Sequence, residues 1–186
     1  IDDTLIQSRM LNTGKGPAVR SLRAQADKAA YKARMRRAVD DQENLTLRQG
    51  EAAKILADGG KIEGVVTTTG AIIRCKAVIV ATGVYLKSRI IIGDCAWQGG
   101  PQGLLAAGSL GESLKDLGFE LRRFKTGTPA RVDGRTVDFT QMIPQAGDEP
   151  IVPFSFLTDE ALENRALCYL TYTNEGTHTI IRENLH

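Results

Sequence analysis

The sequence has little that would support a metal centre, a disulfide framework or a membrane span. Only three of its 186 residues are cysteines and two are histidines. The cysteines Cys75, Cys95 and Cys168 show no C-x-x-C spacing and have no paired histidines near them, which argues against a zinc site and a set of disulfides. No apolar run approaches the length of a transmembrane helix. We therefore expect no metal ligand, no membrane segment and a reducing compartment, the cytoplasm.

A second absence concerns the loop that holds a dinucleotide. No G-x-G-x-x-G opens a strand–helix unit, so the sequence has no complete cradle for a pyrophosphate at a helix N-terminus. The sequence also begins at Ile1 rather than at Met, and it ends at His186 inside a segment with a helical pattern. We expect from these features an internal segment of a longer protein.

Charge and hydrophobic content are those of an ordinary globular chain. Hydrophobic residues make up 42% of the sequence, which is enough for a buried core. Lys and Arg number 24 against 22 Asp and Glu, so the formal net charge is +2. This balance neither requires nor excludes a nucleic-acid partner, and any electrostatic contact with one must be local. We interpret the basic run at 15–37 as a solvent-exposed face.

Hydrophobic patterning predicts an α/β fold. Residues 20–42 lack Pro and Gly and carry Leu and Ala at helical spacing, which predicts a helix. A small antiparallel meander follows, with strands expected at 45–49, 53–57, 61–69 and 72–73 and a tight turn at 58–60. Residues 76–83 have the continuous apolar centre of a strand buried on both faces of a parallel sheet.

The second half of the chain alternates between a helix and short extended segments. Ser109 and Glu112 match a capping box at a helix start, and Gly118 is placed to end that helix. The remaining elements are expected as strands at 120–123 and 168–173 and a helix at 177–185. A change in composition near Leu121 predicts a boundary between a first domain, 1–121, and a second, 122–186.

The end of the predicted buried strand, Ala81-Thr82-Gly83, is a candidate cofactor contact. A side chain at position 83 would hinder the approach of the backbone to a flat ligand or a pyrophosphate. In two-dinucleotide-binding flavoproteins, a strand of this kind ends close to FAD, and the segment that contains Ala52 would offer backbone groups to the adenine. Alone, Ala-Thr-Gly is as typical of an ordinary strand ending in a glycine turn. The order of helix, meander and strand favours the flavoprotein interpretation.

Several short stretches resemble those of one family, in the same order along the whole chain. They are Arg9-Met10-Leu11-Asn12 with Lys15-Gly16-Pro17-Ala18-Val19, Arg23-Ala24-Gln25-Ala26-Asp27, F-K-T-G-T-P-A-R at 124–131, Asp138-Phe139, Pro153-Phe154-Ser155-Phe156 and C-Y-L-T-Y-T-N-E at 168–175. The chain thereby resembles the MnmG (GidA) family, whose patterns include R-x-L-N-x-x-K-G-P-A-V, R-A-Q-A-D and K-T-G-T-P-P-R. Ala130 stands where the family has its second Pro.

The resemblance implies part of a two-dinucleotide-binding-type FAD domain followed by the start of an inserted α/β domain. Family members are cytoplasmic homodimers that bind FAD and take a hydride from NADH. With a GTPase partner they add an aminomethyl or carboxymethylaminomethyl group to carbon 5 of the wobble uridine of tRNA, and methylenetetrahydrofolate donates the carbon. The family's catalytic cysteines lie before and after this stretch. None of the three cysteines here matches them, so no catalytic residue is assigned.

Two loops carry the remaining candidate contacts. Lys15 and Gly16 precede a predicted helix and suit an anion or the flavin edge. A second group, at the turn around Gly127, could hold a phosphate of NADH or of tRNA through two cations and two hydroxyl groups. Its members are Lys125, Thr126, Thr128 and Arg131. The alternative is a rigid turn set by Gly127 and Pro129 with solvated charges.

Three other functions remain open at this stage. One is the related folate- and FAD-dependent tRNA uridine methyltransferase. The F-K-T-G-T-P and R-A-Q-A-D motifs argue against it. Another is a non-catalytic module that binds tRNA or a protein partner on the same scaffold. The third is a flavin disulfide reductase, against which the lack of a redox C-x-x-C argues. For the tRNA-modifying enzyme itself we expect this stretch alone to be inactive, because it lacks the pyrophosphate loop and the reactive cysteines.

Overall fold

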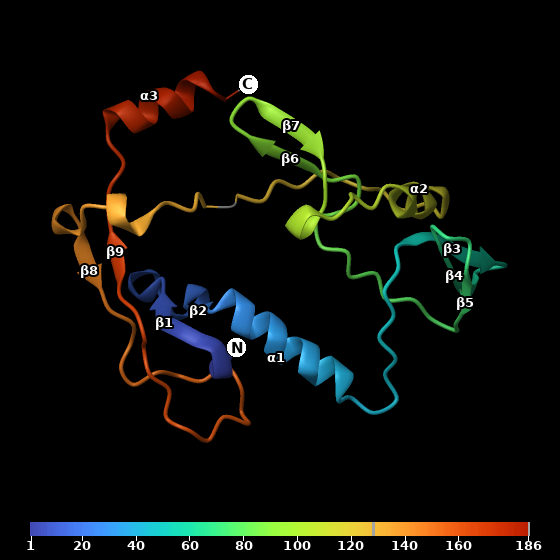
Figure 1. The fold of residues 1–186 in the computed structure, drawn as a ribbon, viewed down its shortest axis with the longest axis horizontal. Coiled ribbons are helices and arrows are strands. Elements are labelled where there is room, and N and C mark those ends of the chain that lie inside the picture. Colours follow the sequence, from blue (N-terminus) through green and yellow to red (C-terminus); the bar gives the residue numbers. More distant parts are fainter. Residues whose placement is uncertain (128, 186) are drawn as a thin grey trace. The chain divides into compact units, whose positions relative to one another are not determined.

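The computed structural model describes residues 1–127 and 129–185. The chain forms two compact units, which we call unit 1 and unit 2 (Figure 1). Unit 1 comprises Ile1–Leu47 and Arg131–His186, and unit 2 comprises Arg48–Ala130. The units reflect contacts within this chain, and the expected domain boundary at 121/122 stays a prediction.

Unit 1 begins with a hairpin and a helix. Strand β1 (Leu5–Leu11) pairs antiparallel with β2 (Ser21–Ala26), and helix α1 (Lys28–Asp40) follows. Asp27 caps the helix, because its carboxylate accepts hydrogen bonds from the amides of Ala29 (2.8 Å) and Ala30 (3.0 Å). The prediction of a helix from residue 20 was therefore wrong for its first third. Pairing with β1 overrides the helical propensity of this Ala-rich segment, whose side chains alternate between exposed and half-buried.

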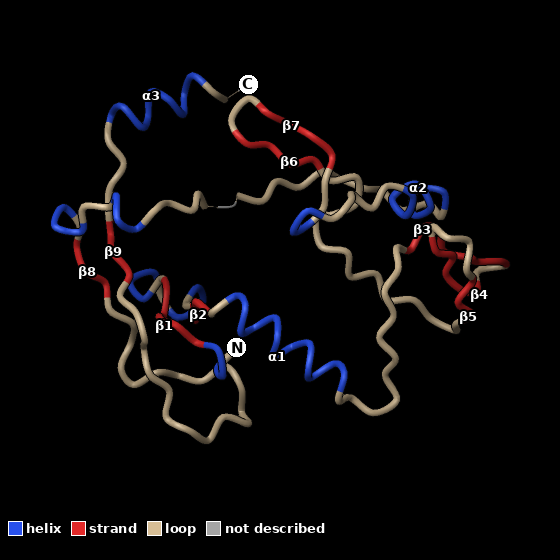
Figure 2. The backbone as a smooth tube through the Cα atoms, viewed as in Figure 1, coloured by secondary structure: helices blue, strands red, loops and turns tan. Residues whose placement is uncertain are grey.

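The rest of unit 1 supplies a second hairpin and a terminal helix. Strand β8 (Ile143–Gln145) pairs antiparallel with β9 (Cys168–Leu170), as the red tubes in Figure 2 show. Helix α3 (Glu175–Glu183) starts at its cap Asn174, whose side-chain oxygen accepts a hydrogen bond from the amide of Thr177 at 3.0 Å. The final strand and helix of the sequence prediction are thus confirmed in their type, with shifted ends.

Unit 2 contains the expected meander. Strands β3 (Ala52–Asp58), β4 (Lys61–Thr67) and β5 (Ile72–Arg74) form one antiparallel sheet in that order. The β3–β4 turn needs Gly59 and Gly60, because both have positive φ, +53° and +78°. A separate hairpin joins β6 (Arg89–Ile92) to β7 (Cys95–Gln98). Helix α2 (Ser109–Asp116) follows this hairpin in the sequence.

The hydrophobic core of unit 2 lies between α2 and β3. Leu110 and Leu114 of the helix are buried against Ile55 of the strand, which is 6% exposed. The hydroxyl of Ser113, on the same face of α2, accepts a hydrogen bond from the buried amide of Ile55 at 3.0 Å. The helix therefore supplies both apolar contact and a hydrogen-bond acceptor to the strand, in a core that contains few other buried side chains.

The start of α2 differs from the sequence prediction, whereas its end agrees with it. The prediction of a capping box at Ser109 and Glu112 was wrong, because Gly108 occupies the cap position and has no side chain to accept a hydrogen bond there. The C-terminal stop is confirmed: Gly118 has a φ of +91° and its amide donates to the carbonyl of Lys115 at 2.8 Å. The next amide, that of Phe119, donates to the carbonyl of Leu114 at 3.0 Å. These two bonds form a Schellman motif, which satisfies carbonyls that the helix leaves free.

Three predicted strands are not formed. Residues 45–49, 76–83 and 120–123 have no strand conformation, and Ile79 is 93% exposed. A strand buried in a parallel sheet needs hydrogen-bonding neighbours on both sides, and the strands of the described residues are all paired elsewhere, in antiparallel sheets. The fold class is thus confirmed only as a mixture of helices with small antiparallel sheets.

One buried carboxylate ties the N-terminus of the chain to a distant loop of unit 1. Asp2 is 5% exposed and accepts hydrogen bonds from the amides of Phe154 (3.1 Å) and Ser155 (3.0 Å) and from the hydroxyl of Thr158 (2.7 Å). Burial raises the pKa of Asp2, but these three donors and the positive charge of the N-terminus outweigh it and hold the pKa below its ordinary value of 3.8.

This arrangement predicts an acid-sensitive unit 1. Because the folded-state pKa of Asp2 is lowered, its contribution to stability is complete above the ordinary pKa and is lost as the pH falls through the folded value. We expect the urea concentration at the unfolding midpoint of unit 1 to decrease when the pH is lowered below about 4. In Asp2→Asn this decrease should be smaller, and the variant should already be less stable than the wild type at pH 7. Urea titrations at pH 7 and pH 3 measure the difference. Equal pH dependence of the two proteins would contradict this role.

Candidate functional site

A cavity of about 470 Å³ in unit 2 contains the turn that the sequence singles out. Three segments line it: the turn at residues 80–87, one side of α2 that includes buried Leu114 and exposed Glu112 and Lys115, and the extended segment 120–124 that follows the helix. Thr82 and Gly83 of the predicted Ala-Thr-Gly contact lie in its wall, whereas Ala81 does not line it.

The turn at Thr82-Gly83 has a left-handed backbone at its glycine. Gly83 has a φ of +56°, and the amide of Tyr85 donates to the carbonyl of Thr82 at 3.3 Å. A Cβ at position 83 would lie 3.5 Å from the Tyr85 ring. Glycine thus suits the conformation of this turn, which lies in the wall of the cavity.

Four cations and two carboxylates line the same cavity. The carboxylate of Glu112 binds Lys87 and lies 3.6 Å from the ammonium group of Lys115. The hydrogen bond from Lys87, with the nearby charge of Lys115, holds the pKa of Glu112 below its ordinary value. These contacts leave one positive charge in excess on this side of the cavity.

The segment after α2 carries a second excess charge. The guanidinium of Arg122 binds the carboxylate of Glu120 at 3.1 Å, so these two charges compensate one another. Arg123 also lines the cavity and is exposed to solvent. With Lys87, Lys115, Arg122 and Arg123 against Glu112 and Glu120, the cavity lining carries two positive charges more than negative ones. Such a lining suits a ligand with phosphate groups.

The other predicted contacts are distributed over both units. Ala52 begins β3 and packs against the core of unit 2. Lys15 and Gly16 lie in a loop of unit 1, where Gly16 has a φ of +94°. The structure thus does not bring this loop and Thr82-Gly83 into one compact unit.

The phosphate-binding group predicted at 125–131 is also divided. Lys125 and Thr126 are exposed and directly follow the cavity-lining segment of unit 2, whereas Arg131 belongs to unit 1. Thr128 lies outside the described residues. Sequence reasoning missed the cavity residues Lys87, Glu112 and Arg123. The signal in the sequence that could have identified Arg123 is the adjacent Arg122-Arg123 pair, directly before the F-K-T-G motif.

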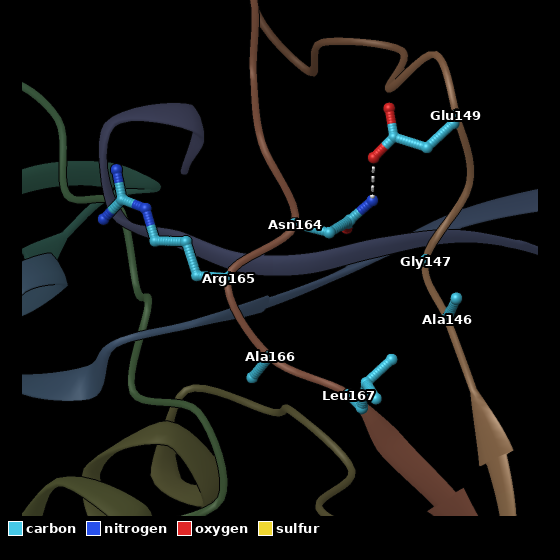
Figure 3. A pocket seen from close by; sticks show the side chains of 7 residues that line it. All are labelled: Ala146, Gly147, Glu149, Asn164, Arg165, Ala166 and Leu167. Atoms are coloured by element: carbon cyan, nitrogen blue, oxygen red, sulfur yellow. Dashed lines mark hydrogen bonds between the residues drawn. The ribbon is translucent and has the colours of Figure 1, made fainter.

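Unit 1 contains a smaller cavity of about 320 Å³ between residues 146–149 and 164–167 (Figure 3). Asn164 joins its two walls, because its amide group donates to Glu149 Oε1 and to the carbonyl of Asp148, both at 2.9 Å. The side chain of Arg165 extends away from this pair in Figure 3. Every polar atom of the Asn164 side chain is used in holding the loops together, so we interpret this cavity as structural.

Comparison with known proteins decides the family. The family model described as "Glucose inhibited division protein A" matches residues 1–186, the whole of the chain. The chain belongs to the glucose inhibited division protein A family. A relative in this family from Clostridium botulinum (strain Loch Maree / Type A3), the tRNA uridine 5-carboxymethylaminomethyl modification enzyme MnmG, is 56% identical over 186 residues. The enzyme of that name from Caldicellulosiruptor saccharolyticus is 57% identical over 185 residues.

The structure agrees with a solved member of the glucose inhibited division protein A family. GidA of Aquifex aeolicus, in its form I crystal, matches the whole chain with a TM-score of 0.88 and 43% sequence identity. The chain covers 32% of that protein and 30% of the two curated enzymes named above. It therefore spans about a third of the length of its relatives.

The described residues, 1–127 and 129–185, lack two features of other functional classes. No helix among them is both long and apolar enough to cross a membrane. They also contain no group of three or more His, Cys, Asp or Glu residues that could hold a metal ion.

Proposed function

We propose that this chain forms part of an FAD- and NADH-dependent enzyme that modifies carbon 5 of the wobble uridine of tRNA. The observation that carries the proposal is the match of the entire chain, at 56% identity, to an enzyme named for carboxymethylaminomethyl modification of tRNA uridine. The proposal includes the aminomethyl or carboxymethylaminomethyl product, a GTPase partner, methylenetetrahydrofolate as the carbon donor, and a cytoplasmic homodimer.

The cavity of unit 2 fits a role in holding a dinucleotide cofactor. Its lining has an excess of positive charge, and Gly83 offers a turn of backbone without a side chain. When bound, FAD would supply the hydride and electron chemistry that none of this chain's side chains can supply. The contribution of the chain's own residues is to bind: backbone groups of Thr82-Gly83 approach the cofactor, and Lys87 and Lys115, which share the carboxylate of Glu112, supply positive charge for its phosphates.

The first test uses the full-length protein that contains this chain. We expect the purified protein to carry one FAD per subunit, with the absorbance bands of a flavin that bleach when NADH is added. Chain 1–186 alone is expected to retain no flavin and to leave tRNA unmodified. A full-length protein without flavin, or turnover of tRNA by the isolated chain, would contradict the proposal.

Replacing Gly83 with alanine provides a test at residue level. Alanine at a φ of +56° is strained by about 1–2 kcal/mol, and relief of this strain would change the turn whose backbone lines the cavity. We expect the affinity of the full-length protein for FAD to fall about tenfold or more, which corresponds to about 1.4 kcal/mol. Titration of the flavin-free protein with FAD gives the value.

The matched control is Gly59→Ala. Gly59 has a similar φ of +53° but lies in the β3–β4 turn, where an added Cβ meets nothing within 4 Å. It should lose similar stability without losing affinity for FAD. Equal affinities for FAD in the two variants would show that Gly83 is not part of the cofactor site.

A further inference from the structure

The outer end of the unit 2 cavity combines an exposed aromatic ring with an arginine. Phe124 lines the cavity and is 76% exposed. Arg123, its neighbour in the sequence, lines the cavity as well. An accessible aromatic face beside a guanidinium group is the pair of features with which proteins bind single-stranded nucleic acids, by stacking on a base and by contact with its phosphate.

The charges around this pair single out Arg123. Each of the other cations of the lining lies within ion-pair distance of a carboxylate, Lys87 and Lys115 with Glu112 and Arg122 with Glu120. No ion pair involving Arg123 is found among the described residues. An exposed guanidinium without a carboxylate partner is available for a ligand's phosphate at no cost of breaking an existing pair.

We propose that Arg123 and Phe124 bind one nucleotide of the tRNA substrate, with the phosphate on Arg123 and the base stacked on Phe124. The inference rests on the proposed function and deepens it, because it assigns a different ligand to each of two parts of the cavity. Thr82-Gly83 serve the cofactor, and the more exposed segment 122–125 receives the RNA. Lys125 follows this part of the segment in the sequence, outside the cavity lining, and adds a further positive charge for the RNA.

The exposure of Phe124 favours RNA over a second dinucleotide at this end. Phe124 is 76% exposed, so its ring can receive a base that enters from solvent without any rearrangement of the cavity. In the basic helix α1, Arg34 and Arg36 already bind Asp3 (2.6 Å) and Asp40 (2.7 Å). Those pairs would have to break before these arginines could bind phosphates.

The experiment uses the full-length holoenzyme and unmodified tRNA. The variants are Arg123→Gln, Phe124→Leu and Phe124→Tyr, with Lys61→Gln as a control that removes one exposed charge at the β3–β4 turn. For each, the dissociation constant for tRNA, the FAD content and the KM for NADH are measured. We expect Arg123→Gln and Phe124→Leu to bind tRNA about fivefold or more weakly, and Phe124→Tyr and Lys61→Gln to stay within about twofold of the wild type.

A salt titration separates contact with phosphate from a structural role. The slope of log Kd against log salt concentration should decrease by about one for Arg123→Gln and remain unchanged for Phe124→Leu. FAD content and the KM for NADH should not change. Unaltered tRNA binding in both variants overturns the inference, and so does a loss of FAD or a raised KM for NADH with tRNA binding intact, which would assign this end to a dinucleotide. A wild-type protein without flavin would instead reject the proposed function itself.

Discussion

Replacing Leu114 with alanine is expected to lower the free energy of unfolding of unit 2 by about 2–5 kcal/mol. Leu114 is 7% exposed and packs with Leu110 and Ile55 in the core between α2 and β3. Truncation removes buried apolar surface and leaves a cavity that its few neighbours cannot fill. Because this core contains so few buried side chains, the loss is a large share of the stability of the unit.

The single tryptophan makes this prediction measurable. Trp97 lies in β7 of unit 2, so its fluorescence reports the urea unfolding of that unit rather than of unit 1. The control is Leu105→Ala, the same truncation at a side chain that is 84% exposed, which should change stability by less than about 0.5 kcal/mol. Equal effects of the two substitutions would show that the α2–β3 core does not hold unit 2 together.

Replacing Asn164 with aspartate is expected to destabilise unit 1 by about 2–4 kcal/mol. Asn164 accepts a hydrogen bond from the amide of Ser8 and donates to the carbonyl of Asp148 and to the carboxylate of Glu149, each at 2.9 Å. Aspartate keeps only the first of these bonds. It also places a negative charge beside a carbonyl oxygen and a second carboxylate, so its effect should become smaller when the pH is lowered.

The surroundings of Asn164 leave little room for relaxation. Ser8 is 1% exposed, and a Cβ at Gly147 would lie 2.2 Å from the Asn164 oxygen. Thermal unfolding followed by circular dichroism gives the loss in stability, and exchange of the Ser8 amide gives its local cause. Asn44→Asp is the matched control, because Asn44 is exposed in the same unit. If both variants unfold at the same temperature, the bridging role assigned to Asn164 is wrong.

Local signals in the sequence predicted those elements whose cause is itself local. The meander was predicted because alternating residues and Gly59-Gly60 specify the hairpin within one short stretch. The stop at Gly118 was predicted for the same reason, since a Schellman motif involves only one helix end. Residues 21–26 were assigned to a helix because their strand conformation depends on pairing with β1, which begins at Leu5 and is invisible to local propensity.

The site was predicted only in part for a similar reason. Thr82-Gly83 were singled out from sequence because Gly83 has no side chain and follows an apolar run, and these are local properties. Arg123 could not be ranked above Arg122, because the difference lies in which of them has a carboxylate partner. The predicted strand at 76–83 depends on neighbouring strands, and the described residues provide none beside it.

The central claim is that this chain serves in the modification of the wobble uridine, and the nucleosides of cellular tRNA test it most directly. Cells in which the gene for the full-length protein is deleted are compared with cells that receive it back, and tRNA digests are analysed by liquid chromatography and mass spectrometry. We expect the uridine with an aminomethyl or carboxymethylaminomethyl group at carbon 5 to disappear in the deletion and to return with the gene. Unchanged levels of these nucleosides in the deletion would contradict the account.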